Sequence, residues 1–397
     1  MDPFAGFAIA RLPRLRFGDG TVASLPEEVA ALGRRVLIVT GARSFPASPH
    51  WPVLLEGLAA RGVAWEHFAV AGEPGPDLVD EAAARFRGAG IEVVLGIGGG
   101  SALDAAKAIA GLIPVGRSVM DYLEGVGPEL PYEGPALPFV AAPTTAGTGS
   151  EATRNAVLGR QGPQGFKKSF RHDSLVARVA VVDPTLLATC PPAVLAADGM
   201  DAFTQLLESY VSLKASPFTD ALVWSGLQAF AEGFFPVWEG GEGRAEGRRR
   251  LAYASLVSGI ALAQTGLGSV HGMAPALGSL FGISHGLACG TLVAEATDVN
   301  IAALAVRNPA SPALGKYAAV GRLLAGKPGA DDAEARRRLV WILREWTDRL
   351  ELARLGEFAV GEPDFPRIAA GSRGSSMKTN PLVLDDAEIV EVLRRRL

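Results

Sequence analysis

Cysteine is nearly absent from this chain, which has only Cys190 and Cys289 among its 397 residues. Two cysteines cannot form the disulfide framework of a small secreted domain, and such low usage fits a reducing compartment. The first residues also lack the basic segment and apolar run of an export signal. These absences predict a cytoplasmic protein.

Positive charge is not in excess either, because the chain has 38 Lys and Arg residues and 42 Asp and Glu residues, which gives a net charge of −4. This balance gives no electrostatic footprint for nucleic acid or an anionic membrane. The longest apolar stretch, residues 257–283, contains Gln264, six glycines and His271. A pair of buried helices explains it better than a membrane span. We therefore expect neither a nucleic-acid nor a membrane partner.

Strand-like and helical segments alternate in the first half of the chain. Short β-branched runs occur at 35–40, 65–69, 92–97, 137–142 and 179–183. Helical periodicity lies at 26–32, 50–61, 78–88 and 102–112. This alternation predicts an α/β fold with a parallel sheet covered on both faces. Residues 7–24 are predicted to form a hairpin.

The character of the sequence changes near Asp183. From Pro191 onward the periodicity is almost only helical, at 195–212, 219–230, 248–262, 331–350 and 386–397. The sequence thus predicts an N-terminal α/β domain over residues 1–184 and an all-α C-terminal domain over residues 185–397.

A glycine-rich turn, Gly96-Ile-Gly98-Gly99-Gly100-Ser101, joins the predicted strand at 92–97 to the following helix. Glycines let the backbone approach a pyrophosphate, and the helix N-terminus offers free N–H groups. Tight turns need glycine in any case, but the strand before and helix after favour phosphate binding. The turn departs from a Rossmann fingerprint, since it follows the third predicted strand and ends in serine. The residue that reads the adenosine ribose should then lie at Thr40-Gly41.

A second polar turn, residues 143–155, follows the predicted strand at 137–142 and is rich in hydroxyl groups and glycine. It could wrap the ribose and nicotinamide end of a dinucleotide, or it could be a surface turn with a helix cap. Its place at the carboxyl end of a strand favours ligand binding, because open α/β sheets bind ligands there.

Asp201, Gln205, His271 and His285 form a candidate metal set in the helical half. Asp201 and Gln205 are four residues apart and share one face of a helix. The two histidines stand fourteen residues apart in the apolar, glycine-rich stretch. A carboxylate with two imidazoles is a common set for a divalent metal with an open position. The spacing is equally compatible with packed core histidines and a helix-capping aspartate.

Taken in order, these segments resemble the iron-containing (group III) alcohol dehydrogenase family, whose fold is shared with glycerol dehydrogenases and dehydroquinate synthases. The matching segments are residues 98–107, 143–155, 181–184, 199–204, 271–274, 285–286 and 380–381. The resemblance covers essentially the whole chain. It implies a dinucleotide-binding N-terminal domain, a metal-binding all-α domain, a homodimer, and reversible hydride transfer between an alcohol and an aldehyde or ketone.

The resemblance also assigns roles to individual residues. Asp201, His271 and His285 match three of the four metal ligands and are the predicted catalytic residues. The positions that match cofactor contacts are Gly98, Gly99, Gly100, Ser101, Asp104, Thr144, Thr145, Thr153 and Lys167.

Three positions depart from the family pattern. Gln205 stands where the fourth ligand is a histidine, and an amide oxygen is a weaker donor for a transition metal. Fe²⁺, Zn²⁺ or an empty site therefore all remain open. Pro275 replaces a histidine that is a candidate for proton relay, so the proton must pass through water, the cofactor ribose or another side chain. Gly41 replaces the aspartate of NAD-preferring members, and Arg43 could pair with a 2′-phosphate, so we predict that NADP is accepted beside NAD.

The main prediction is an NAD(P)-dependent alcohol dehydrogenase, or aldehyde or ketone reductase, with metal-assisted hydride transfer and a small-molecule substrate. One alternative is a metal-independent reductase resembling maleylacetate reductases, although the presence of Asp201, His271 and His285 argues against it. A second is a lyase resembling dehydroquinate synthase, although the turn at 144–151 resembles the dehydrogenase branch. A non-catalytic binding role is the third.

Overall fold

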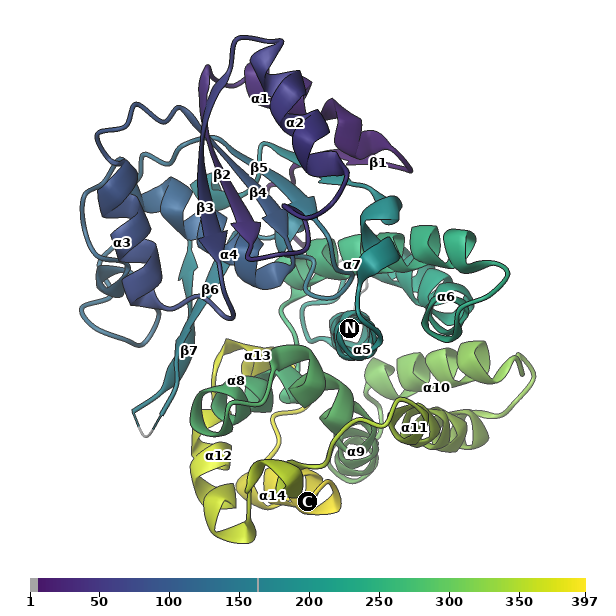
Figure 1. Cartoon of the computed structure of the whole chain (residues 1–397). Coiled ribbons are helices and arrows are strands. Elements are labelled where there is room, and N and C mark those ends of the chain that lie inside the picture. The colour runs from purple at the N-terminus through teal and green to yellow at the C-terminus, as the bar shows by residue number, and fades with distance from the viewer. Residues whose placement is uncertain (1–5, 163) are drawn as a thin grey trace. The chain divides into compact units, whose positions relative to one another are not determined.

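The computed structural model describes residues 6–162 and 164–397 (Figure 1). Residues 1–5, part of the segment behind the expectation of no export signal, lie outside this range. The chain divides into two compact units. One, the sheet unit, contains Ala10–Arg160 and Lys167–Pro191, and the other, the helical unit, contains Gln161–Phe166 and Pro192–Leu397. The predicted fold class, a parallel α/β part followed by a helical part, is confirmed.

The sheet unit is built on six strands in the order β1-β8-β5-β4-β2-β3. Every neighbouring pair is parallel. The strands are β1 (Arg14–Phe17), β2 (Arg35–Gly41), β3 (Ala64–Val70), β4 (Val93–Gly98), β5 (Phe139–Pro143) and β8 (Val179–Val182). β4 and β5 are buried along their whole length, which explains why they are continuous apolar runs rather than alternating ones.

Helices cover both faces of this sheet. They are α1 (Leu25–Ala30), α2 (His50–Ala59), α3 (Pro76–Phe86) and α4 (Gly100–Leu112). Leu25 of α1 and Leu58 of α2 share one core cluster with Leu95 of β4. On the opposite face a Cβ at Gly96 would lie 2.8 Å from the Cβ of Ala106 on α4, so this glycine lets α4 pack closely on the sheet.

The predicted hairpin at residues 7–24 is wrong. β1 pairs in parallel with β8, and Arg14 lies opposite Val179. After β1 the chain turns into a short 3₁₀ helix, Thr21–Ser24. Turn residues near 18–20 indicated that the chain reverses, but they carry no information about a strand partner far along the sequence. The small sheet formed by β6 (Asn155–Arg160) and β7 (Phe166–Arg171) was not predicted from the sequence.

The helical unit carries the helices that follow residue 191. They are α5 (Pro192–Val211), α6 (Pro217–Glu239), α7 (Arg244–Thr265), α8 (Ser269–Phe281), α9 (His285–Arg307), α10 (Pro312–Ala325), α11 (Asp332–Arg349), α12 (Phe365–Gly371), α13 (Ser375–Thr379) and α14 (Asp386–Arg395). One core cluster joins Met273 of α8, Leu292 of α9 and Ile389 of α14. α5, α8 and α9 carry the residues discussed below.

The apolar stretch at 257–283 forms the predicted pair of buried helices. α7 and α8 meet at an angle of 101°. Within the described ranges, α9 is the single unbroken helix long and apolar enough to cross a membrane, but 72% of its apolar window is buried inside the protein. Burial of this kind is typical of a core helix.

Candidate metal centre and cofactor turns

Asp201, Gln205 and Glu208 project from one face of α5. Their spacing of four and then three residues matches the helical repeat, so the side chains follow one another along that face. All three are buried. Asp201 lies in the middle of α5 and not at its start. It is therefore not a helix cap, and a carboxylate buried there needs a cationic or hydrogen-bonded partner.

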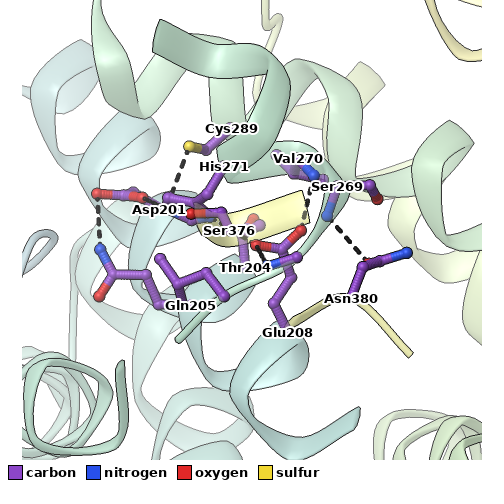
Figure 2. A network of polar contacts seen from close by, with 12 residues as sticks. Asp201, Thr204, Gln205, Glu208, Ser269, Val270, His271, Cys289, Ser376 and Asn380 are labelled. Carbon is purple, nitrogen blue, oxygen red and sulfur yellow. Dashed lines mark hydrogen bonds and ion pairs between the residues drawn. The ribbon is translucent and has the colours of Figure 1, made fainter. Parts of the chain in front are cut away.

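His271, in the first turn of α8, lies between two of these carboxylates (Figure 2). Its Nε2 is 3.1 Å from Oδ1 of Asp201, and its Nδ1 is 2.7 Å from Oε2 of Glu208. A carboxylate can only accept a hydrogen bond, so Nδ1 carries the proton. In the neutral ring the lone pair of Nε2 then faces Asp201, as a metal-ligating histidine requires.

Glu208 also caps the N-terminus of α8. It accepts hydrogen bonds from the backbone N–H groups of Gly268 at 2.9 Å and Val270 at 2.7 Å. These N–H groups have no partner within the helix, and the carboxylate also complements the positive end of the helix dipole. The same side chain thus fixes the start of α8 and the orientation of His271.

Asn380 anchors α8 from a third direction (Figure 2). Its Oδ1 accepts a hydrogen bond from the backbone N–H of Ser269 at 3.0 Å, and its Nδ2 donates to Oδ1 of Asn300 on α9 at 2.6 Å. Asn380 belongs to the Asn380-Pro381 segment singled out in the sequence. Its contacts tie the helix that carries His271 to the helix that carries His285.

His285 and Cys289 lie one turn apart on α9 and complete the cluster. Nε2 of His285 is 3.9 Å from Oδ1 of Asp201. Sγ of Cys289 is 3.5 Å from Nε2 of His271 and 3.9 Å from Nε2 of His285. One ligand atom from each of Asp201, His271, His285 and Cys289 lies within 4.8 Å of the others. Sequence reasoning missed Cys289, although its spacing of four residues from His285 places both on one helical face.

Gln205 lies beside Asp201, but its amide is already engaged. Its Nε2 donates to Oδ2 of Asp201 at 3.2 Å, and its Oε1 accepts from Oγ of Ser258 at 2.8 Å. Figure 2 shows the nitrogen of this amide directed toward Asp201 and the oxygen directed away. The amide therefore holds Asp201 in place from the α5 side.

Ionisation in the cluster is strongly coupled. Burial favours a higher pKa for Asp201, but His285 and His271 outweigh it and lower that pKa to about 2. Burial opposes a charge on His271, yet its contacts with Cys289, Asp201 and Glu208 raise its pKa well above the usual value. Burial, together with the charges of Asp201 and Glu208, raises the pKa of Cys289 to about 12.

The donor set fits a divalent cation. An anionic, buried Asp201 with two imidazoles and a thiol offers the oxygen, nitrogen and sulfur ligands found in zinc and other transition-metal sites. Metal binding would release the protons of His271 and Cys289, and the cation would supply the positive charge that Asp201 needs.

In the sheet unit, Gly41, the glycine turn and Thr144 meet where β2, β4 and β5 end. A Cβ at Gly98 would lie 2.7 Å from the Cβ of Ala102 and 3.2 Å from the backbone N of Gly41. The N–H of Thr144 donates to the carbonyl of Gly98 at 2.9 Å. Gly98 thus allows the glycine turn to approach both neighbouring strand ends, as backbone binding of a phosphate requires.

The other glycines of the turn pack against the second polar turn. A Cβ at Gly99 would lie 3.2 Å from Cγ2 of Thr145, and one at Gly100 would lie 2.7 Å from Cγ2 of Thr148. Gly99 caps α4, and Ser101 stands in its first turn. The N-terminus of α4 therefore faces the same strand ends as the two turns.

Asp104, on α4, and Thr153, within the second turn, belong to a network centred on Lys107, which is fully buried. Nζ of Lys107 donates to Oγ of Ser150 at 2.9 Å, to Oγ1 of Thr153 at 3.0 Å and to the carbonyl of Asn155 at 2.5 Å. Ser150 donates in turn to Oδ1 of Asp104 at 2.5 Å. Burial lowers the pKa of Lys107, an effect that Asp104 opposes. Sequence reasoning quoted Lys107 in the matching segment but gave it no role.

Arg43 and Lys167 lie outside this network. Arg43 is exposed, two residues beyond the end of β2. Lys167 stands on β7, where its Nζ is 2.7 Å from Oε1 of Glu73.

The two cofactor turns and the metal cluster lie in segments of the chain that match models of a known protein family. Residues 13–184 match the family model "Iron-containing alcohol dehydrogenase", and residues 195–397 match "Fe-containing alcohol dehydrogenase family, C-terminal". Long-chain-alcohol dehydrogenase 1 of Geobacillus thermodenitrificans is 34% identical over 287 residues, which cover 70% of each chain.

Two solved structures show the same likeness. A 1,3-propanediol oxidoreductase superimposes with a TM-score of 0.89 at 27% identity, covering 99% of this chain and 100% of that one. The sulfoacetaldehyde reductase of Bifidobacterium kashiwanohense, solved in complex with NAD⁺, superimposes with a TM-score of 0.84 at 25% identity and 99% coverage of each chain.

Proposed function

This chain belongs to the iron-containing alcohol dehydrogenase family, and we propose from that premise which of its residues carry the reaction. It is an NAD(P)-dependent oxidoreductase that acts on CH–OH groups of small molecules and uses a divalent metal. The observation that carries the proposal is the convergence of Asp201, His271 and His285, whose ligand atoms meet in the helical unit.

Asp201, His271 and His285 hold the metal and are the catalytic residues. A divalent cation at this position supplies Lewis acidity toward the substrate oxygen. Asp201 contributes the negative charge that retains the cation. Glu208 keeps the proton of His271 on Nδ1 and leaves Nε2 free to bind. Gln205 donates to Asp201 and so limits the directions in which this carboxylate turns.

The two turns of the sheet unit hold the cofactor, whose nicotinamide supplies the hydride chemistry. The residues proposed to bind it are Gly41, Arg43, Gly98, Gly99, Gly100, Ser101, Asp104, Thr144, Thr145, Thr153 and Lys167. Gly98 and its neighbours admit the pyrophosphate to the N-terminus of α4, where free N–H groups and the helix dipole favour an anion. Asp104 and Thr153 act indirectly, since the bond of Asp104 with Ser150 and that of Thr153 with Lys107 shape the second turn.

Assembly and location extend the proposal. We propose a homodimer, as the family resemblance implies, and a cytoplasmic location, which the low cysteine content supports. Light scattering of the purified protein tests the first, since a dimer would have twice the 41.3 kDa mass of the chain.

The test of the metal centre is the metal content of untagged protein, with activity measured before and after chelation. We expect about one metal ion per chain, loss of activity with a chelator and recovery when metal is restored. His271→Ala and His285→Ala should each lose the metal and most of the activity. His172→Ala, which changes a histidine in the sheet unit, should keep the metal. Metal-free protein that still reduces aldehydes or ketones would contradict the proposal.

A further inference from the structure

We propose that the thiolate of Cys289 is the fourth protein ligand of this metal centre and that it directs the centre toward Zn²⁺ rather than Fe²⁺. The inference rests on the proposed function, because it assumes that Asp201, His271 and His285 hold a metal. It adds a ligand that neither the motifs nor the family matches assign. It also explains how the centre is completed without a histidine at position 205.

Gln205 is poorly placed to be that ligand. Its nitrogen faces Asp201 and carries hydrogens that point toward the cluster, and an amide N–H group cannot coordinate a cation. Its oxygen accepts a hydrogen bond from Ser258 on α7. Turning the amide over would break its bond to Asp201, and Ser258 would then have to donate to the carbonyl of Ser255 and accept from the amide nitrogen.

Cys289 is well placed. Its side chain is fully buried, and within 3.9 Å its sulfur contacts both imidazole nitrogens that face Asp201. α9 brings His285 and Cys289 to the cluster together, since residues four apart lie on one face of a helix. Cys289 belongs to the core cluster that contains Met273 and Leu292, but its sulfur also lies against the nitrogens of both histidines and so completes a ring of donor atoms.

The separations fit tetrahedral coordination. With metal–nitrogen and metal–oxygen distances of about 2.1 Å and a metal–sulfur distance of about 2.3 Å, the edges of a tetrahedron are about 3.4 to 3.6 Å. The sulfur lies 3.5 Å from Nε2 of His271 and 3.9 Å from Nε2 of His285. Oδ1 of Asp201 lies 3.1 Å from the first nitrogen and 3.9 Å from the second. Small side-chain adjustments therefore suffice to enclose one ion. Because four protein ligands fill a tetrahedron, the substrate oxygen would bind as a fifth ligand, and zinc sites expand to five-coordination in this way.

The chemistry of sulfur sets the metal preference. Thiolate is a soft donor that favours zinc over harder cations, whereas a carboxylate and imidazoles bind both Fe²⁺ and Zn²⁺. Asp201 and the thiolate together also balance the charge of a dication in a buried place, where an unbalanced charge is costly. Binding releases the thiol proton, and Cys289 undergoes no change of oxidation state.

Cobalt substitution tests the sulfur ligand directly. Apo-protein loaded with Co²⁺ should show a thiolate-to-cobalt charge-transfer band in the near ultraviolet. Cys289→Ser should lose this band while the d–d bands of bound cobalt remain. Cys190→Ser, the matched control at the other cysteine, should keep it. A band that survives in Cys289→Ser, or wild-type protein that binds cobalt without the band, would overturn the assignment of Cys289.

X-ray absorption of the zinc-loaded wild-type protein gives a second readout that does not depend on whether a variant folds. We expect one sulfur scatterer at about 2.3 Å together with nitrogen and oxygen scatterers at about 2.1 Å. A shell of nitrogen and oxygen alone would overturn the Cys289 proposal and leave the metal centre intact. Failure to bind either Co²⁺ or Zn²⁺ would overturn the proposed metal centre as well.

Metal competition tests the preference. Loss even of an outer-shell partner typically weakens metal affinity by about 10–100-fold, so loss of the thiolate should weaken Zn²⁺ binding at least that much. Under anaerobic conditions with equal Zn²⁺ and Fe²⁺, the wild-type and Cys190→Ser proteins should take up zinc. In Cys289→Ser the zinc-to-iron ratio should fall at least about tenfold. An unchanged ratio would contradict the selectivity claim.

Discussion

At the scale of single residues, the buried ionisable group of the second turn is as informative as the metal cluster. Glu151 lies in the short 3₁₀ helix Ser150–Ala152 and is buried. Burial raises its pKa to about 7 from an ordinary value of 4.5, and the charge of Lys107 opposes this rise only in part. The folded protein therefore holds this proton at pH values where the unfolded chain has lost it.

This difference predicts the pH dependence of stability. Because the folded-state pKa is the higher one, the contribution of Glu151 is most favourable below about pH 4.5. It falls as pH rises toward about 7 and stays low above that. Glu151→Gln removes the titration. From pH 5 to pH 8 the variant should therefore gain about 2.5 kcal/mol in unfolding free energy relative to wild type. Denaturant unfolding at pH 5 and pH 8 measures the difference in unfolding free energy between the variant and wild type. The same difference at both pH values would contradict the prediction.

At the scale of elements, α5 organises the metal cluster through its contact with the start of α8. Glu208 of α5 receives two backbone N–H groups and the ring of His271. Asn380 holds the neighbouring Ser269. The position of His271 is thus set by the helix terminus on which it stands.

Glu208→Gln tests this coupling between elements. Gln has a single acceptor oxygen, so it cannot receive both backbone N–H groups and the histidine ring as the carboxylate does. We expect metal affinity to fall about 10–100-fold, the usual effect of losing a carboxylate behind a ligating histidine. Glu295→Gln is the matched control, since Glu295 is a buried carboxylate on α9 that bonds Arg344 instead. Equal metal affinities in the two variants, measured by competition with a chelating dye, would contradict the role of Glu208.

The end of β2 gives the second prediction at this scale. A Cβ at Gly41 meets no atom within 4 Å, so Gly41→Asp should be accommodated. The new carboxylate would bind the ribose 2′-hydroxyl and repel a 2′-phosphate. We expect the ratio of kcat/KM for NADP over NAD to fall by about two orders of magnitude, roughly 2.8 kcal/mol. Gly88→Asp, in equally open surroundings after α3, is the control. If the ratio moved as much in the control as at Gly41, the interpretation of Gly41 would fail.

At the scale of the whole molecule, each unit has a core of its own. Val36, Leu95 and Val140 belong to the core of the sheet unit. Met273 and Leu292 belong to that of the helical unit. The proposed cofactor residues all lie in the sheet unit, and the proposed metal ligands all lie in the helical unit. Each ligand should therefore stabilise mainly the unit that binds it.

Hydrogen exchange tests this division. A ligand at about 100 times its dissociation constant stabilises the state it binds by about 2.7 kcal/mol. Chelation should therefore speed amide exchange in α5, α8 and α9 and leave β2, β4 and β5 nearly unchanged. NADP should slow exchange in those strands and around the turn at 143–155. An equal response of both units to the metal alone would contradict the prediction.

Much of this molecule could be predicted from its sequence because the signals are local. Apolar runs such as residues 35–40 and 92–97 predicted strands close to their observed bounds, and the glycines at 98–100 predicted a turn before a helix. Lys107 and Glu208 were missed because a charged residue in a helix usually indicates a solvated face. Their burial depends on Ser150 and on the start of α8, which lie 43 and about 60 residues away.

By itself, the sequence determined the alternation of strands and helices that makes a parallel sheet and the helical second half. It also identified Asp201, His271 and His285 as candidate metal ligands. Only the tertiary structure decided that β1 joins β8, and that Cys289 lies beside His271 while the oxygen of Gln205 turns to Ser258. The physical reason is that periodicity shows which face of an element is buried, but not which element covers it. Asp201 and His271 are 70 residues apart, and only the packing of α5 against α8 and α9 brings their atoms to 3.1 Å.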